Sequence, residues 1–162
     1  MQSKNTSETT QDLRREQLSD CFAENYIAYQ YALVEFFAEH LSDVSRSFGG
    51  DLEQVMVVAI LGQRRLAVLR GGTPEDPSST QGMSISASRL ADATGIPRET
   101  VRRKLALLKD RGWAVQGADG SWTLAADETS AGSLVRRDLA ELDLRARRRV
   151  ARLVAALERL EC

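Results

Sequence analysis

The 162-residue chain is poor in the residues from which catalytic and metal centres are built. It has one histidine, His40, and two cysteines, Cys21 and Cys162, and none of them has metal-ligand spacing. It also lacks a phosphate-binding glycine loop and a Gly-x-Ser-x-Gly nucleophile turn. We therefore expect no enzymatic activity, no metal and no cofactor.

Long apolar runs are absent as well. No run approaches the ~20 residues that a helix needs to cross a bilayer, and residues 1–17 lack the apolar core of a signal peptide. The chain is 43% hydrophobic with a formal net charge of −1, which is ordinary for a soluble globular protein. These features favour a cytoplasmic protein without membrane association. In that compartment we expect free thiols, with a redox-linked pair as the alternative.

Residues 84–125 contain two short helical patterns, a turn and a hairpin pattern in a fixed order. Residues 86–94 carry apolar side chains at the three- and four-residue spacing of one buried helical face. Gly95 is expected to end this helix in the left-handed conformation. Pro97 then favours the start of a second helix over residues 97–111, because its ring fixes a helical backbone angle.

Two strand-like runs follow the second helix, at residues 113–116 and 121–124, and a GADG turn joins them. This pattern predicts a β-hairpin. We expect Trp113 and Trp122 to pack the hairpin onto the helices, with base stacking as the alternative. Residues 83–85 are expected to add a short third strand, and Ser86 is expected to cap the first helix. Two helices and a hairpin in this order predict a winged helix-turn-helix, with the hairpin as its wing.

The second helix has two chemically different faces. Val101, Leu105 and Leu108 fall on one side and are expected to face the core. Six basic and two acidic residues give residues 97–111 a net charge of +4. An arginine can bond both acceptors of a guanine edge, a glutamate can accept from cytosine, and a threonine can touch a thymine methyl group or a phosphate. A solvated helix face is the alternative interpretation. The predicted DNA-binding residues are Arg98, Glu99, Thr100, Arg102 and Arg103 for base reading, with Lys104, Lys109 and the hairpin wing for phosphate contact.

The run GIPRETVRRKLALLKDRGW, residues 95–113, resembles the winged helix of bacterial one-component transcription regulators. Its segment RETVRR is similar to the R-E-T-V-x-R recognition helix of the Crp family. That resemblance implies that Arg98, Glu99 and Arg103 read base edges. The chain has no Gly-rich strands of a cyclic-nucleotide domain, so the resemblance does not extend to cyclic AMP. The overall order of elements is more similar to MarR-type regulators, in which terminal helices form a dimer around the winged domain.

The N-terminal part divides into a tail and helices. Residues 1–10 are polar without periodicity and are expected to be disordered. Residues 11–70 form the N-terminal helices, of which the first is predicted from Leu13 to Phe48. Asp51 is expected to cap the next helix, over residues 51–70. That helix is apolar nearly all round, which predicts burial on every side.

Residues 71–82 contain two prolines, three glycines and no apolar side chain. They are predicted to be a loop before the winged domain at residues 83–125. Residues 126–162 are the C-terminal part, with a long amphipathic helix over 133–160 and Asp127 and Ser130 as candidate caps. An arginine run on its wet face is expected to pair with acidic residues of the first helix, with nucleic-acid affinity as the alternative. That run is Arg145, Arg147, Arg148, Arg149 and Arg152.

Both terminal helices carry continuous apolar stripes that one small domain cannot easily bury. A twofold dimer through these helices would bury the stripes and place two recognition helices one DNA turn apart. The resemblance to MarR-type proteins implies a small aromatic effector bound beside the dimer helices. On general grounds of aromatic burial, we expect the aromatic residues of this region to fill the dimer core, with the effector site as the alternative. These residues are Tyr26, Tyr29, Tyr31, Phe36 and Phe37.

The sequence thus predicts a mainly α fold of α+β character, a winged helix-turn-helix with long N- and C-terminal dimerisation helices and a small hairpin wing. The predicted function is a homodimeric, sequence-specific transcription regulator that binds double-stranded DNA with helix 97–111 in the major groove. The alternative is a winged-helix module that binds proteins and not DNA.

Overall fold

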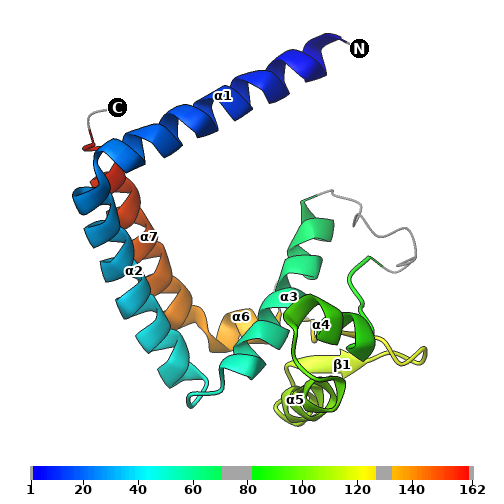
Figure 1. Cartoon of the computed structure of the whole chain (residues 1–162). Helices are drawn as coiled ribbons and strands as arrows, with labels where there is room; N and C mark the ends of the chain where they lie inside the picture. The colour runs from blue at the N-terminus through cyan, green and yellow to red at the C-terminus, as the bar shows by residue number, and fades with distance from the viewer. Residues whose placement is uncertain (1, 71–81, 127–132, 161–162) are drawn as a thin grey trace. The chain divides into compact units, whose positions relative to one another are not determined.

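The computed structural model describes residues 2–70, 82–126 and 133–160, with the side chains of residues 2–9 excepted. It is mainly helical with one small antiparallel sheet of two strands, as the sequence predicted (Figure 1). The chain forms two compact units. The first contains residues 1–43 and 144–162, and the second contains residues 44–143.

In the first unit, the predicted long helix is divided into α1 (Gln2–Glu24) and α2 (Tyr26–Ser47). The division falls at Asn25, whose side-chain amide donates to the carbonyl oxygen of Cys21 at 3.1 Å. Asparagine side chains compete in this way with the helical backbone pattern. The single helix from Leu13 to Phe48 was therefore wrong, and α1 also extends through residues 2–10, where we expected disorder.

Two contacts lie beside this break. The rings of Phe22 and Tyr29 stack across it, with centroids 4.9 Å apart. Cys21 is buried and disulfide-bonded, which corrects the expectation of a free thiol there. Cys162 lies outside the described residues.

The second unit is built from α3 (Leu52–Leu69), α4 (Ala87–Thr94), α5 (Arg98–Asp110), a hairpin and α6 (Leu134–Asp138). The hairpin consists of β1 (Ala114–Gln116) and β2 (Trp122–Leu124). These elements share one hydrophobic core. Its fully buried side chains are Val57, Leu61, Leu90, Val101, Leu105, Leu108 and Trp113.

The predicted helix ends are confirmed at three positions. The side chain of Asp51 accepts from the backbone N–H of Gln54 at 2.9 Å and caps α3. Ser86 caps α4 in the same way. Gly95 ends α4 with φ = 70°, the left-handed conformation that glycine adopts without steric cost. Pro97 lies directly before α5, so the helix begins at Arg98, one residue later than predicted.

The hairpin pairs Ala114 with Leu124 and Gln116 with Trp122. The expected third strand is reduced to a single bridge, in which Ile85 and Trp122 exchange two backbone hydrogen bonds of 2.8 and 2.9 Å. Trp113 and Trp122 are both buried, so the prediction that they pack the hairpin onto the helices is confirmed.

Helix α3 is less buried than predicted. Leu52, Met56 and Leu66 are exposed, because the core elements contact only one side of the helix. On the buried side, a Cβ on Gly62 would lie 3.9 Å from Leu124 Cδ1, an ordinary contact distance.

The predicted C-terminal helix over residues 133–160 is also divided. Its first part is α6, capped by Ser133, and its second part is α7 (Ala140–Leu157). The candidate caps Asp127 and Ser130 lie outside the described residues, as does the predicted loop at positions 71–81. Among the described helices, none combines the length and apolar character that crossing a membrane requires.

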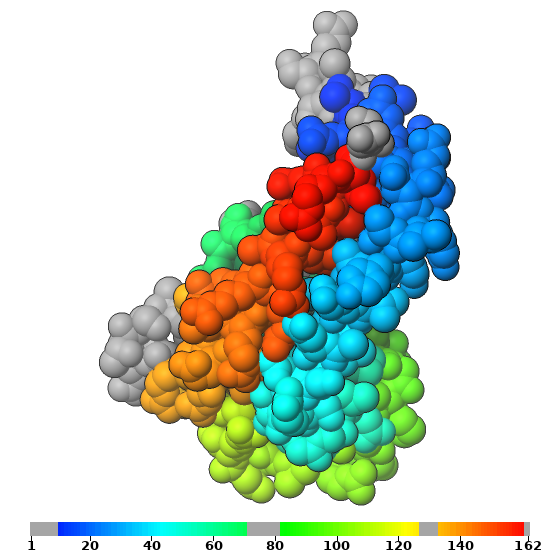
Figure 2. All heavy atoms as spheres, turned by 90° about the vertical axis from the view of Figure 1, so that its left-hand side faces the viewer, coloured from blue at the N-terminus to red at the C-terminus, as the bar shows by residue number. Residues whose placement is uncertain are grey.

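Within the first unit, α2 and α7 lie side by side, and Figure 2 shows α2 in blue to cyan beside α7 in orange to red. Arg145 donates to Asp43 at 2.8 Å, and Arg149 contacts both Asp43 and Glu39. Arg152 also pairs with Glu39. The prediction that the arginine run pairs with acidic residues of the N-terminal helices is confirmed for these three arginines.

Candidate nucleic-acid interface

Helix α5 presents one face to the core and one to solvent. Val101, Leu105 and Leu108 are completely buried, as predicted, and this burial fixes the rotation of the helix. Arg98 and Arg102 are exposed on the side that faces the hairpin. The outward direction of these arginines thus follows from the apolar spacing of the same helix.

A groove of about 650 Å³ runs along this side of α5. Its α5 wall carries three cations, which come from Arg98, Arg102 and Lys109, and one acid, Asp110. The remaining lining comes from the first turn of α4 and from the hairpin. These other residues are Ser86, Ala87, Ser88, Gln116, Gly120 and Trp122, and α5 itself adds Ala106.

The structure divides the seven predicted site residues into three groups. Arg98, Arg102 and Lys109 line the groove. Glu99 and Arg103 are exposed but do not line it, and Thr100 is half-buried. Lys104 alone forms the third group, because its side chain is buried and bonded to Asp51.

Glu99 interacts with the groove indirectly. Its carboxylate accepts from Arg102 Nη1 at 3.2 Å, and both side chains are largely exposed. An exposed pair one helical turn apart contributes little to stability. Breaking this pair would therefore cost Arg102 little.

Lys104 is only 8% exposed and points to the N-terminus of α3. Its Nζ donates to both carboxylate oxygens of Asp51 at 2.7 Å and lies 3.2 Å from Glu53. The predicted phosphate contact by Lys104 is therefore corrected, because its ammonium group is engaged inside the protein. The sequence held a signal for this, since position 104 falls three residues after Val101 and one before Leu105, on the inward side of the helix.

The pKa values of this pair reflect the contact. The hydrogen bond to Asp51 is the main cause that raises the pKa of Lys104. Burial alone would raise the pKa of the Asp51 carboxyl. The hydrogen bonds from Lys104 and from the Gln54 backbone outweigh burial, and the positive charge of Arg103 adds to them, so the pKa of Asp51 is lowered.

One further cation of the helical segment is engaged elsewhere. The guanidinium of Arg111 lies over the Trp113 ring, 3.5 Å from its centroid. The Trp113 ring in turn donates from Nε1 to Asp138 at 2.8 Å. Of the six basic residues that gave this segment its net charge of +4, Lys104 and Arg111 thus act within the fold.

Sequence reasoning expected phosphate contact from the hairpin without naming its residues, and it missed the contribution of α4 to the groove. Ser86, Ser88 and Gln116 offer polar groups to it, but their types and spacing carry no motif. Only the packing of α4, α5 and the hairpin brings them together. Within the described ranges, no group of three or more histidine, cysteine, aspartate or glutamate side chains is arranged to hold a metal ion.

Comparison of the chain with protein-family models, with curated proteins and with solved structures finds no match. The groove and its charges are therefore the basis for assigning a function.

Proposed function

We propose that this protein is a dimeric, sequence-specific DNA-binding transcription regulator of the winged helix-turn-helix type. One observation carries the proposal: Arg98, Arg102 and Lys109 form a cationic row on an exposed helix, along a groove whose opposite wall is a β-hairpin. A helix about 10–12 Å wide fits the DNA major groove, which is about 12 Å wide.

In this proposal α5 enters the major groove with its N-terminal end first. Arg98 and Arg102 reach base edges, where a guanidinium can bond both acceptors of a guanine. Lys109 and Gln116, from the two walls of the protein groove, contact DNA phosphates. These contacts position the helix without reading sequence. Glu99 and Arg103 lie further round the helix and read the opposite strand or its phosphates.

The decisive experiment is the selection of bound sequences from random duplex DNA, followed by affinity measurements on the selected site. Arg102→Ala should weaken specific binding by roughly 1–3 kcal/mol and relax the base preference at one position. Arg136→Ala is the matched control, because Arg136 is exposed on α6 outside the groove, and it should leave affinity unchanged. Equal affinities of the native protein and Arg102→Ala for the selected site would overturn the assignment of Arg102.

Arg103→Ala separates the structural argument from the resemblance to the Crp family. That resemblance assigns base reading to Arg103, whereas the groove geometry favours Arg102. A larger loss of specificity in Arg102→Ala than in Arg103→Ala supports the groove as the reading surface.

Salt dependence separates DNA binding from the alternative of a protein-binding module. Cations that neutralise phosphates release counterions, so the logarithm of the binding constant must fall steeply with the logarithm of salt concentration. Lys109→Ala should reduce this slope by about one. Absence of binding to any duplex at low salt would remove the DNA proposal and leave the protein-binding module.

A further inference from the structure

We infer that the exposed apolar face of α2 pairs with the same face of a second copy of this chain, antiparallel, about a twofold axis at Val34. The inference specifies the partner surface of the dimer in the proposed function and rests on that dimer. It does not depend on DNA binding, so its test is independent of the DNA experiments.

The face consists of large apolar side chains that the described residues of the first unit leave largely exposed. Ile27, Tyr31 and Val34 are 84%, 71% and 54% exposed, and Phe37 and Leu41 are also exposed. Ile27, Val34 and Leu41 are seven residues apart, the repeat of a helix pairing seam, and Tyr31 and Phe37 lie three residues before and after Val34. Exposed apolar stripes of this size are typical of interfaces.

The spacing also reads the same from both ends. When two copies of α2 meet antiparallel at Val34, Ile27 lies opposite Leu41 and Tyr31 lies opposite Phe37. A twofold interface requires this kind of self-complementarity, because each residue must contact a counterpart that contacts it in return. Large and small side chains match as well, since Gln30 then lies opposite Ala38.

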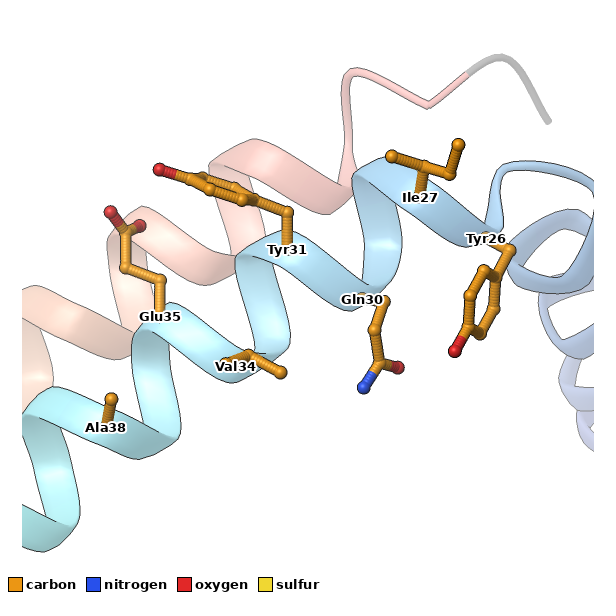
Figure 3. A pocket seen from close by; sticks show the side chains of 7 residues that line it. All are labelled: Tyr26, Ile27, Gln30, Tyr31, Val34, Glu35 and Ala38. Atoms are coloured by element: carbon orange, nitrogen blue, oxygen red, sulfur yellow. The ribbon is translucent and has the colours of Figure 1, made fainter.

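The surface is shaped to receive a helix. A hollow of about 530 Å³ lies on this face. Figure 3 shows Tyr26, Gln30 and Val34 in one row and Ile27, Tyr31 and Glu35 in a second row along α2. These rows are the four-residue ridges of a helix, and the furrow between them accepts the ridge of another helix.

The electrostatics permit like faces to meet. Asp43 and Glu39 are engaged by arginines of α7. Glu35 is the only charged residue that lines the hollow, and its carboxylate lies 3.9 Å from Arg152 Nε of the same chain. Two copies therefore approach without uncompensated repulsion between their acidic groups.

The area is adequate for a stable dimer. Tyr26, Tyr31 and Phe37 are 61%, 71% and 48% exposed. At about 150–250 Å² for each aromatic residue, these three alone leave roughly 270–450 Å² uncovered. The aliphatic side chains Ile27, Val34 and Leu41 bring the face close to the ~800 Å² per partner that standard interfaces bury.

The test is the mass of the full chain in solution, measured by sedimentation or light scattering over a range of concentrations. The native protein should be a dimer, and Val34→Glu should shift the dissociation midpoint upward by at least tenfold in concentration. Leu66→Glu is the control, because Leu66 is similarly exposed at 61% but lies on α3 in the other unit. Circular dichroism of each variant establishes that the helices are retained.

A pair of charge substitutions tests the orientation without disturbing the apolar residues. In the antiparallel pair, the double variant Gln30→Arg with Ala38→Glu places opposite charges across the interface and should remain dimeric. Gln30→Glu with Ala38→Glu places like charges there and should dissociate. The opposite order of stability would overturn the antiparallel arrangement.

Two further outcomes would overturn the inference as a whole. One is a native chain that stays monomeric at all concentrations, and the other is a dimer that Leu66→Glu dissociates while Val34→Glu does not. A monomer that still binds its selected DNA with a steep salt slope would reject this surface but leave the DNA proposal standing.

Discussion

Lys104 and Lys109 lie five positions apart on α5 and have different tasks. Lys104 is buried against Asp51 and Glu53, whereas Lys109 is exposed in the groove. In the net charge of +4 for residues 97–111, the two lysines count equally. Their difference arises from the rotation of the helix, which the buried side chains Val101, Leu105 and Leu108 determine.

Replacing Lys104 should therefore destabilise the fold. Lys104→Met removes the charged partner of Asp51, whose carboxylate still accepts from Gln54, and a lost hydrogen bond to a charged group costs roughly 1.5–3 kcal/mol. Lys109→Met should change the free energy of unfolding by less than about 0.5 kcal/mol, because it alters only a surface side chain. Denaturant unfolding measures both values, and equal stability of the two variants would contradict the buried ion pair.

The same contact predicts a pH dependence. The pKa of Asp51 is lower in the folded protein than its ordinary value, so the folded state favours the ionised carboxylate. Its contribution to stability is present above the unfolded pKa of about 3.9 and is lost as the pH falls through the lower folded pKa.

Asp51→Asn tests this dependence because asparagine can still cap α3 but does not titrate. The free energy of unfolding of the native protein should fall more steeply between pH 5 and pH 3 than that of the variant, over a range set by ordinary carboxyl pKa values of about 4. Denaturant titrations at several pH values give the free energy of unfolding of both proteins. If it changes equally with pH in the native protein and in Asp51→Asn, Asp51 does not contribute to the pH dependence.

At the scale of elements, the sequence predicted those ends that depend on local chemistry. Asp51, Ser86 and Gly95 end or begin helices through their own side chain or backbone freedom, and they do so in the structure. The break at Asn25 was missed, because an asparagine inside an otherwise periodic pattern carries only a weak local signal.

The burial of α3 and the composition of the groove were harder to predict, because both depend on tertiary packing. The periodicity of α3 gave no direction, since its apolar residues occur on every side. Leu66 is exposed because the elements of the core pack against the other side of α3. The candidate site was similarly half predicted: Arg98 and Arg102 came from the helix pattern, but Ser88 and Gln116 reach the groove only through packing.

Two glycines should respond to alanine with opposite signs. Gly95 has φ = 70° and open space around it, so Gly95→Ala should destabilise the protein by about 1 kcal/mol through backbone strain alone. Gly62 is helical, and an added Cβ meets Leu124 Cδ1 at 3.9 Å, so Gly62→Ala should stabilise α3 by roughly 0.5–1 kcal/mol. Thermal unfolding of the two variants checks the signs. A stabilising Gly95→Ala would show that α4 does not end in the left-handed conformation.

The pairing of α2 with α7 offers a comparison between neighbouring arginines. Arg149 contacts Glu39 and the buried Asp43, whereas Arg148 is exposed. Arg149→Met should lower the midpoint of thermal unfolding, because Glu39 and Asp43 lose a shared partner. Arg148→Met should leave the midpoint nearly unchanged. If both variants melt together with the native protein, the ion pairs do not hold α2 and α7.

At the scale of the whole molecule, the two candidate surfaces belong to different units. The cationic groove lies in residues 44–143, and the apolar face of α2 lies in residues 1–43. Substitutions in one unit should therefore leave the chemistry of the other intact. This separation allows the contribution of dimerisation to DNA binding to be measured by itself.

The selected DNA site should be an inverted repeat with half-sites about one helical turn apart, or a multiple of it, because a twofold dimer presents two copies of α5. Val34→Glu should bind a single half-site as well as the native chain does, since Arg98 and Arg102 are unchanged. It should lose the additional affinity for the full repeat, because the second α5 is no longer held near its half-site at a high effective concentration. The ratio of full-site to half-site affinity measures this gain, and the ratio should fall at least tenfold in Val34→Glu and stay at the native value in Leu66→Glu. An unchanged ratio in Val34→Glu would mean that the α2 face does not join the two DNA-binding units.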